Sequence, residues 1–385
     1  MPRIATLTVT AVTAAAAVAA LVPQLSPAPT PRSLILSAFG DAQGMFGESK
    51  PIISAMQNKV DRSGSSTFCA AVVEGTLSNQ PVTAVVTGTG EQNSQACMQE
   101  MLGWYSPAIT EVIWSGIAGF SPAVGGLYDN RGQRRAKATP VMIGDVCISS
   151  LSWNYDLHFS SVDEWASRRT ADNRYGTAGG WWSIKNGKGK PRARGFQDVT
   201  QFVTADRALA DELVTASRSV DWPTKSAGVK RKIKRFFPAS KIRNTVKVFD
   251  SSRCGEVSGN NFWHSTTEDL LARRNLASQI TAADIRKASA EDVVVASAME
   301  ASGWMGAVKT WNAANRLAIP MALVRGASNY DQVPLNAAGN PVNGPDGKPL
   351  TALEDIKLGF KTAGADVAIH NAAAPVLALF AARAS

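Results

Sequence analysis

The sequence predicts an α/β fold, and three observations support that prediction. Residues 292–331 read as a buried strand, a helix and a second buried strand. Short apolar runs recur along the chain and end in small or polar residues, as strands do beside ligands in open α/β sheets. The chain has 385 residues, 45% of them hydrophobic, which suits one large domain or two smaller ones.

The stretch 292–331 organises the prediction. Residues 293–295 form a β-branched apolar run, and apolar residues recur at helical spacing through 299–315. Pro320 closes the connection before a second apolar run at 321–324. A connection of this length between two buried strands predicts a right-handed crossover in a parallel sheet.

The stretch 292–331 also carries polar side chains at positions that a ligand could reach. Glu300 opens the helix, and Arg325, Ser328 and Asn329 follow the second strand. A carboxylate can accept two hydrogen bonds from a vicinal diol, and an Asn offers a donor and an acceptor to a heterocycle. Arg325 could hold an anion or orient a water. The alternative is a carboxylate favoured by a helix N-terminus beside a solvated loop.

The N-terminal half contributes further strands with small residues after them. The run 34–36 leads into Ser37 to Asp41, a candidate first ligand loop, and 68–73 is the next strand. The strand 82–86 leads into Thr87-Gly88-Thr89-Gly90 and a helix near residue 93. Glycines there let backbone N–H groups face an anion at the helix N-terminus, although no Walker or dinucleotide fingerprint is present.

Later segments extend the same pattern. The strand 111–114 ends in Ser115 to Phe120, small residues that let a flat ligand approach the backbone. Residues 142–148 and 246–249 return to the sheet, and a helix over 365–382 packs across it. Phe262 and Trp263 follow a small-residue turn and suit stacking on a base, or else are core aromatics beside a turn.

The N-terminus predicts export. Residues 1–31 have a short basic start, an apolar region and a Pro-rich segment, and we expect cleavage after Ala20 or Ala28. The alternative is an uncleaved anchor, and we expect no later stretch to be apolar enough to span a membrane. The remaining domain is 32–385, and the mature protein should be secreted or periplasmic.

The charge balance points to anionic partners without specifying them. The net charge is +9, from 40 Lys and Arg against 31 Asp and Glu. A basic insertion at about 165–245 could bind an anionic polymer or form a solvated basic face. It lacks the patterned aromatics of a nucleic-acid platform, so no specific nucleic-acid partner is predicted.

The four cysteines, Cys69, Cys97, Cys147 and Cys254, lack metal-ligand spacing, so no zinc site is expected. Outside the cytoplasm they could form one or two disulfides, whose pairing is not readable from sequence. Free buried thiols are the alternative. No cofactor is predicted.

Six stretches occur in an order that resembles the nucleoside phosphorylase/nucleosidase superfamily, closest to its secreted purine nucleoside permease-like group. They are VVTGTGEQNSQA, EVIWSGIAGFSPAVGG, VMIGDVCIS, VSGNNFWHS, SAMEASG and ALVRGASNYD. They cover much of residues 33–331 apart from the basic insertion. The resemblance implies a three-layer α/β/α sandwich around a mixed, partly barrel-like sheet. It also implies binding of a purine nucleoside and cleavage of its N-glycosidic bond.

The resemblance implies a role for each matching residue. Glu300 would accept the ribose hydroxyls above Met299, and Asn329 would hydrogen-bond the base. Arg325 with Thr87 and Gly88 would line the phosphate or water side. Phe262 and Trp263 would wall the base, and Gly116 to Gly119 would pass close to it.

The sequence departs from the family pattern at three places. Asn329 stands where many relatives have an Asp that protonates the purine, although the permease-like group also carries Asn here. Trp114 and Ile117 stand where bacterial phosphorylases have Arg and Ser, which argues against a strong phosphate site. The hydrolases' water-activating Glu has Asp41 as its nearest counterpart, with Glu48 as a remote substitute.

Two functions therefore remain open. One is an exported enzyme that cleaves purine nucleosides by hydrolysis or phosphorolysis, with phosphate as the co-substrate in the second case. The other is a non-catalytic nucleoside-binding protein for uptake or storage. A weaker third interpretation is a basic envelope-associated protein whose insertion binds an anionic polymer. Homo-oligomerisation, base preference and the acceptor are not specified by the sequence.

Overall fold

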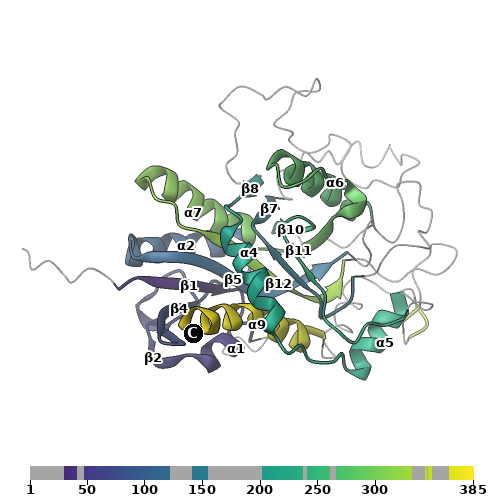
Figure 1. Cartoon of the computed structure of the whole chain (residues 1–385), viewed down its shortest axis with the longest axis horizontal. Helices are drawn as coiled ribbons and strands as arrows, with labels where there is room; N and C mark the ends of the chain where they lie inside the picture. Colours follow the sequence, from purple (N-terminus) through teal and green to yellow (C-terminus); the bar gives the residue numbers. More distant parts are fainter. Residues whose placement is uncertain are drawn as a thin grey trace, which may run out of the picture.

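In the part of the chain that the structure describes, a mixed sheet of twelve strands has helices on both faces, which confirms the predicted α/β class (Figure 1). The computed structural model describes residues 30–40, 47–121, 141–154, 202–236, 241–260, 266–331, 343–344, 346–348 and 364–385. The main path of the sheet is β2-β3-β4-β1-β5-β11-β10-β7-β8, and β12, β6 and β9 branch from β5. The sheet therefore departs from a single flat layer at β5.

The N-terminal strands build one half of the sheet around β1. β1 lies between β4 and β5 and runs parallel to both, while β3 pairs antiparallel with β2 and β4. The bounds are β1 (Arg32–Ser37), β2 (Gln57–Asp61), β3 (Ala71–Leu77), β4 (Gln80–Val86) and β5 (Ile109–Phe120). Ser78 and Asn79 both adopt positive φ in the turn between β3 and β4, the conformation that a tight hairpin requires.

The other half of the sheet comes from the C-terminal strands. β10 runs parallel to β7 and β11, and β12 runs parallel to β5 and antiparallel to β6. The bounds are β6 (Val146–Ser149), β7 (Leu151–Asn154), β8 (Phe202–Thr204), β9 (Val248–Phe249), β10 (Cys254–Ser258), β11 (Val294–Ala298) and β12 (Met321–Tyr330).

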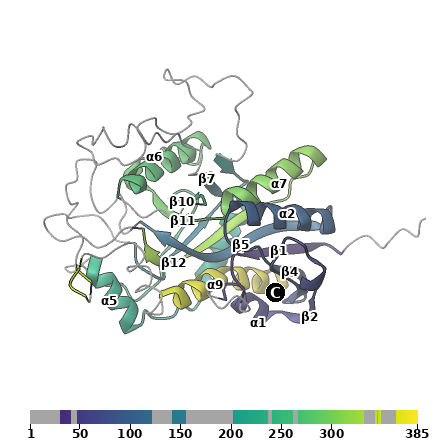
Figure 2. The same cartoon turned by 180° about the vertical axis from the view of Figure 1, so that it is seen from behind.

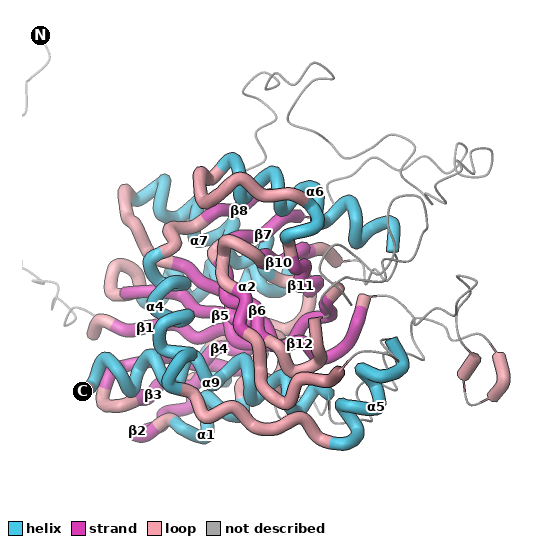
Figure 3. Tube along the Cα trace, turned by 45° about the vertical axis from the view of Figure 1, so that its right-hand side comes forward, coloured by secondary structure: helices cyan, strands magenta, loops and turns pink. Residues whose placement is uncertain are grey.

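Helices cover the two faces in separate groups (Figures 1 and 2). α2 and α7 pack together on one face, and α9 with α4 and α1 covers the other. α6 covers β7, β10 and β11, and α5 lies beside the far end of α9 in Figure 3. The bounds are α1 (Lys50–Ala55), α2 (Glu91–Tyr105), α4 (Ala208–Ala216), α5 (Ala227–Phe236), α6 (Thr266–Ala282), α7 (Ala301–Asn315) and α9 (Gly364–Ala384).

The alternation of side chains along the central strands explains this layering. Leu34 and Leu36 of β1 enter the core under α2 and α7, whereas Ile35 enters the core under α9. Successive side chains of a strand point to opposite faces, so a strand buried on both faces is apolar throughout. β12 shows the same division, with Leu323 on the α2 and α7 side and Val324 on the α9 side.

The predicted parallel crossover around α7 was wrong. β11, α7 and β12 form as expected. However, β12 pairs parallel with β5, whereas β11 pairs antiparallel with the end of β5, so the two strands do not run in the same direction. β5 and β12 also continue through Ser115–Phe120 and Arg325–Tyr330, which were expected as loops after shorter strands. Apolar periodicity identifies a buried segment but carries no information on strand direction, and small residues in a long strand resemble a strand end.

α9 was not expected to be long and apolar enough to span a membrane, yet by length and composition it is. In this structure 56% of its apolar window is buried, and it packs against β5 and β12 as a core helix.

Both pairs of cysteines form disulfides. Cys69 bonds to Cys97 of α2, and Cys147 of β6 bonds to Cys254 of β10. Free thiols, the alternative left open by the sequence, are therefore absent from this structure. The first bond ties the edge of β3 to the helix layer, and the second joins two strands of the sheet.

The Cys147–Cys254 bond should be the more stabilising of the two. It spans 107 residues against 28 for Cys69–Cys97, and a longer closed loop removes more entropy from the unfolded chain. We expect Cys147→Ser with Cys254→Ser to lower the free energy of unfolding in urea by about 2–5 kcal/mol. The Cys69→Ser, Cys97→Ser pair is the control and should lose less; a larger loss there would contradict this expectation.

Candidate functional site

Four buried charged side chains meet where β1, β5, β10 and β12 pass the N-termini of α2 and α7. They are Glu48, Glu256, Glu300 and Arg325, and each is at most 4% exposed. The segments that carry the family resemblance thus lie close together in space although they belong to separate elements. They are the segments around Thr87, Gly116, Ser258, Glu300 and Arg325. We call these four residues the carboxylate–arginine cluster.

Arg325 lies at the centre of the cluster. Its Nε and Nη2 donate to the two carboxylate oxygens of Glu256 at 2.6 and 3.0 Å. Nη2 also donates to Glu300 Oε2 at 3.0 Å, and Nη1 donates to the Ile117 carbonyl at 3.1 Å. The guanidinium stacks 4.7 Å from the ring centre of Trp114, which fixes its plane.

Glu300 is held by backbone as well as by Arg325. It is the N-cap residue of α7, and its Oε2 accepts from the N–H of Met299 at 3.2 Å. Its Oε1 faces Gly90 at the start of α2, whose N–H lies 3.4 Å away. Glu300 and Arg325 therefore converge, but as a direct buried ion pair and not around a ligand-sized space between them, as the sequence interpretation expected.

Glu256 was not identified from the sequence. It lies on β10 with no exposed surface, and besides Arg325 its Oε1 accepts from the N–H of Ala301 in the first turn of α7 at 3.2 Å. A carboxylate in a buried strand requires a partner, but the segment Cys254–Ser258 is too short and too mixed in composition for its burial to be predicted from the sequence.

Glu48 enters the cluster from the segment between β1 and α1. Its Oε2 accepts from the N–H groups of Ala38 and Phe39 at 2.8 and 3.2 Å, and its Oε1 accepts from Ile117 N–H at 2.8 Å. The structure thus places Glu48, the remote substitute in the sequence interpretation, beside the strand end. Asp41 lies outside the described residues.

Burial and charge pairing together shift the pKa values of three residues in the cluster upward. Burial raises the pKa of Glu48 to about 7, against the lowering effects of Arg325 and the Ile117 N–H. Burial likewise raises the pKa of Glu256, although its ion pair with Arg325 opposes this. Burial opposes the charge on Arg325, but Glu256 and Glu300 together raise its pKa above the usual range. Arg325 therefore stays charged, and Glu48 titrates near neutral pH.

Gly116 of β5 leaves the space in which the cluster assembles. A Cβ at this position would lie 2.8 Å from Trp114 Nε1, 2.9 Å from Glu48 Oε1 and 3.0 Å from Arg325 Nη1. A side chain here would therefore displace the two charged groups.

The second predicted glycine, Gly119, faces a different polar group. A Cβ there would lie 2.0 Å from Asp331 Oδ1 and 3.2 Å from Asn329 Nδ2. Asp331 is buried and accepts a hydrogen bond from Ser297 Oγ at 2.6 Å. Asn329 accepts from Ser328 Oγ at 2.7 Å and donates to the Tyr330 carbonyl at 3.2 Å. Asp331 is thus a further buried acid beside Asn329 that the sequence interpretation did not select.

The remaining predicted residues lie around this centre or outside the described ranges. Thr87 is buried at the end of β4 and donates to the Gly88 carbonyl at 2.7 Å. Gly88 and Gly90 adopt positive φ, which turns the loop so that the α2 N-terminus faces Glu300. The predicted aromatics Phe262 and Trp263 lie outside the described residues.

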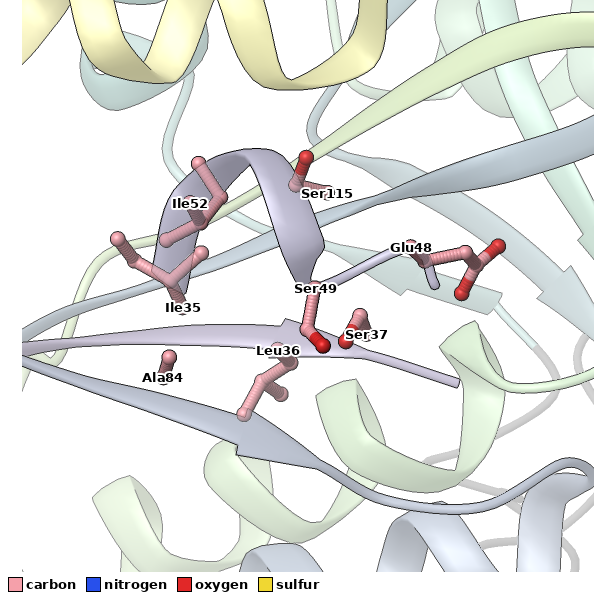
Figure 4. A pocket seen from close by; sticks show the side chains of 8 residues that line it. All are labelled: Ile35, Leu36, Ser37, Glu48, Ser49, Ile52, Ala84 and Ser115. Atoms are coloured by element: carbon pink, nitrogen blue, oxygen red, sulfur yellow. The ribbon is translucent and has the colours of Figure 1, made fainter. Parts of the chain in front are cut away.

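A small pocket adjoins Glu48, with Ile35, Leu36, Ile52 and Ala84 on its apolar side (Figure 4). The space between these side chains has no room for a water molecule, so it cannot hold a small-molecule ligand. In Figure 4 the Glu48 carboxylate extends away from these apolar side chains. The pocket is therefore the space behind Glu48 and not a nucleoside-sized cavity.

Comparisons with known proteins give structural similarity without sequence similarity. No protein-family model and no curated protein matches the chain. Among solved structures, a 5'-methylthioadenosine/S-adenosylhomocysteine nucleosidase from Neisseria meningitidis in complex with methylthio-immucillin-A is 15% identical, with a TM-score of 0.46. The match covers 91% of this chain and 98% of that one.

Two further solved structures match at the same level. A putative nucleosidase of the same kind from Borrelia burgdorferi, bound to adenine, is 15% identical with a TM-score of 0.47, over 91% of this chain and 99% of that one. Futalosine hydrolase of Helicobacter pylori is 13% identical with a TM-score of 0.46, over 91% and 97%. Likeness this distant carries no argument about the activity of this chain.

Adding a methyl group at Gly116 should disrupt the cluster. We expect Gly116→Ala to lower the free energy of unfolding by about 1–3 kcal/mol, because the new Cβ overpacks against Trp114, Glu48 and Arg325. Gly103→Ala is the control, since a Cβ there meets nothing within 4 Å and Ala suits helix α2. The control should gain roughly 0.5–1 kcal/mol. Equal effects in urea unfolding would show that Gly116 has no packing role.

The raised pKa of Glu48 should make stability depend on pH. Between the unfolded value of 4.5 and the folded value of about 7, the folded chain retains a proton that the unfolded chain has released. The free energy of unfolding therefore falls as pH rises through this window. Glu48→Gln should reduce that slope by up to about 1.4 kcal/mol per pH unit, measured by urea unfolding.

Glu100→Gln provides the control for this slope. Although burial opposes the effect, hydrogen bonds from Ser66, Thr67 and Phe68 lower the pKa of Glu100 below 4.5. Its proton is thus already lost across the same window in both states, and the slope should not change. A Glu48→Gln slope equal to that of the parent chain would mean that Glu48 does not titrate near neutral pH.

Proposed function

We propose that this protein binds purine nucleosides and cleaves their N-glycosidic bond. The observation that carries the proposal is the meeting of Glu48, Glu300 and Arg325 at the N-termini of two helices, with one carboxyl titrating near neutral pH. The family-like motifs that surround the cluster support the same reading. Leaving-group departure from a nucleoside generates an oxocarbenium-like sugar, which buried carboxylates stabilise.

Each charged group has a distinct role in this reaction. Glu300, held by Arg325 and by the Met299 N–H, keeps lone pairs for the ribose 2′ and 3′ hydroxyls and places negative charge near the sugar. Glu48 is the candidate general base for the acceptor, since a base works best when its pKa lies near the working pH. Arg325 orients Glu300 and holds the cluster together.

The purine would lie toward Asn329 and Gly119, with Phe262 and Trp263 proposed as its walls. Asn329 donates no titrating proton, so the buried Asp331 beside it is the candidate group for stabilising the departing base. Thr87 and Gly88 line the side of the acceptor. No cofactor is required for this chemistry.

We also propose that the protein acts outside the cytoplasm. Two disulfides tie β3 to α2 and β6 to β10, and such bonds persist in oxidising compartments. The apolar N-terminal segment supports export as well. The basic insertion would then face anionic polymers of the envelope, and self-association remains part of this proposal.

Release of free purine tests the proposed activity. Purified mature protein is incubated with inosine, adenosine and methylthioadenosine, with and without phosphate, and free base is quantified by chromatography. We expect base release, and we expect Glu300→Gln to lower it by about a hundredfold or more, because the sugar loses its anionic partner.

The control for this assay is Glu111→Gln at the opposite end of β5. Glu111 is also buried and forms a bidentate ion pair, with Arg383 at 2.7 and 3.0 Å, so its substitution tests the general cost of losing such a pair. The control should retain the parental rate. Nucleoside binding measured by calorimetry without base release would favour the non-catalytic binding protein. The absence of both binding and base release would contradict the nucleoside assignment.

A further inference from the structure

The donor groups of Arg325 are almost all committed within the protein. A guanidinium has five N–H groups. Three of them point at the carboxylates of Glu256 and Glu300, and a fourth points at the Ile117 carbonyl. Arg325 is 0% exposed, so an incoming anion could bind it only by displacing a buried carboxylate.

N–H groups at the two helix N-termini of the site also have acceptors within the protein. Such termini bind phosphate in many proteins through free N–H groups. Here the Ala301 N–H of α7 donates to Glu256 Oε1 at 3.2 Å, and the Gly90 N–H beside α2 faces Glu300 Oε1 at 3.4 Å. The Glu91 N–H donates to Asn260 Oδ1 at 3.0 Å. Glutamates and an amide of the chain itself thus take the positions of a bound anion.

The balance of charge points the same way. Glu48, Glu256 and Glu300 place three carboxyl groups around one guanidinium. Arg325 is paired with Glu256 and Glu300 whether or not Glu48 carries a proton, so the cluster offers no unpaired positive charge. A phosphate dianion would enter a buried region without a free counter-charge, at a large electrostatic cost.

We infer that Glu256 is a specificity-determining and positioning residue that excludes phosphate and leaves water as the acceptor. The Glu256 carboxylate accepts hydrogen bonds from Nε and Nη2 of Arg325 and from the Ala301 N–H at the start of α7, so these donors are not available to a phosphate. This inference rests on the proposed nucleoside-cleaving function and settles which nucleophile that function uses.

The reaction is then a hydrolysis whose atoms balance without a further reactant. The bond between the anomeric carbon and the purine nitrogen breaks, and its electron pair leaves with the purine. A water oxygen bonds to the anomeric carbon and loses one proton to the Glu48 carboxylate. The purine nitrogen takes up one proton from the solvent and Glu48 releases its proton to the solvent, so the products are free base and free ribose.

The experiment compares the full mature chain with Glu256→Gln and Glu256→Asp at constant ionic strength. One measurement is the binding of inorganic phosphate by calorimetry, which needs no turnover. The other is the sugar product formed in a phosphate series, free ribose or ribose 1-phosphate. Thermal unfolding shows that each variant is folded, and Glu111→Gln is the matched control because it removes another buried Arg-paired carboxylate.

We expect the parent chain, Glu256→Asp and Glu111→Gln to bind no phosphate and to yield free ribose alone. Glu256→Gln should bind phosphate with a dissociation constant at least about tenfold below the highest phosphate concentration at which the parent chain shows no binding, because removing one negative charge frees the fork of Arg325. Ribose 1-phosphate from the parent chain, or equal phosphate affinity in a folded Glu256→Gln, would overturn the inference. If no variant releases base, the proposed function fails, while the calorimetry still decides the role of Glu256.

Discussion

The structure depends on one buried guanidinium that joins three strands and the N-terminus of one helix. Arg325 of β12 bonds to Glu256 of β10 and to Glu300 at the head of α7, and it stacks on Trp114 of β5. Buried charges cost several kcal/mol each unless they are paired and hydrogen-bonded. The elements that carry these groups are therefore fixed relative to one another, and the same groups define the chemistry available at this edge of the sheet.

Gly116 and Gly119 show how the backbone accommodates this arrangement. Both lie inside β5, where their lack of a side chain admits Glu48 and Arg325 at one position and Asp331 at the other. Trp114, on which Arg325 stacks, itself stacks on Trp304 of α7 with ring centres 6.1 Å apart. The site is thus a group of buried polar side chains inside an otherwise apolar core, and their ion pairs and hydrogen bonds offset the cost of burying them.

Part of this arrangement could be predicted from the sequence, for identifiable reasons. Glu300 and Arg325 were found because each follows or precedes a strongly apolar segment, and strand ends concentrate ligand residues. Glu256 was missed because its partner is 69 residues away, and nothing in the local pattern reports the pairing. Glu48 was placed only as a remote substitute, since the path between β1 and α1 is not encoded by periodicity. The antiparallel direction of β11 was not predicted either, because apolar periodicity does not encode strand direction.

The most direct test of the account is a crystal structure of the mature chain with a stable nucleoside analogue bound. The account predicts ribose hydroxyls within hydrogen-bond distance of the Glu300 carboxylate, and the anomeric carbon on the side that faces Glu48. Arg325 should keep both oxygens of Glu256. An analogue bound elsewhere, or one whose sugar makes no contact with Glu300, would contradict the assignment of this cluster as a nucleoside site.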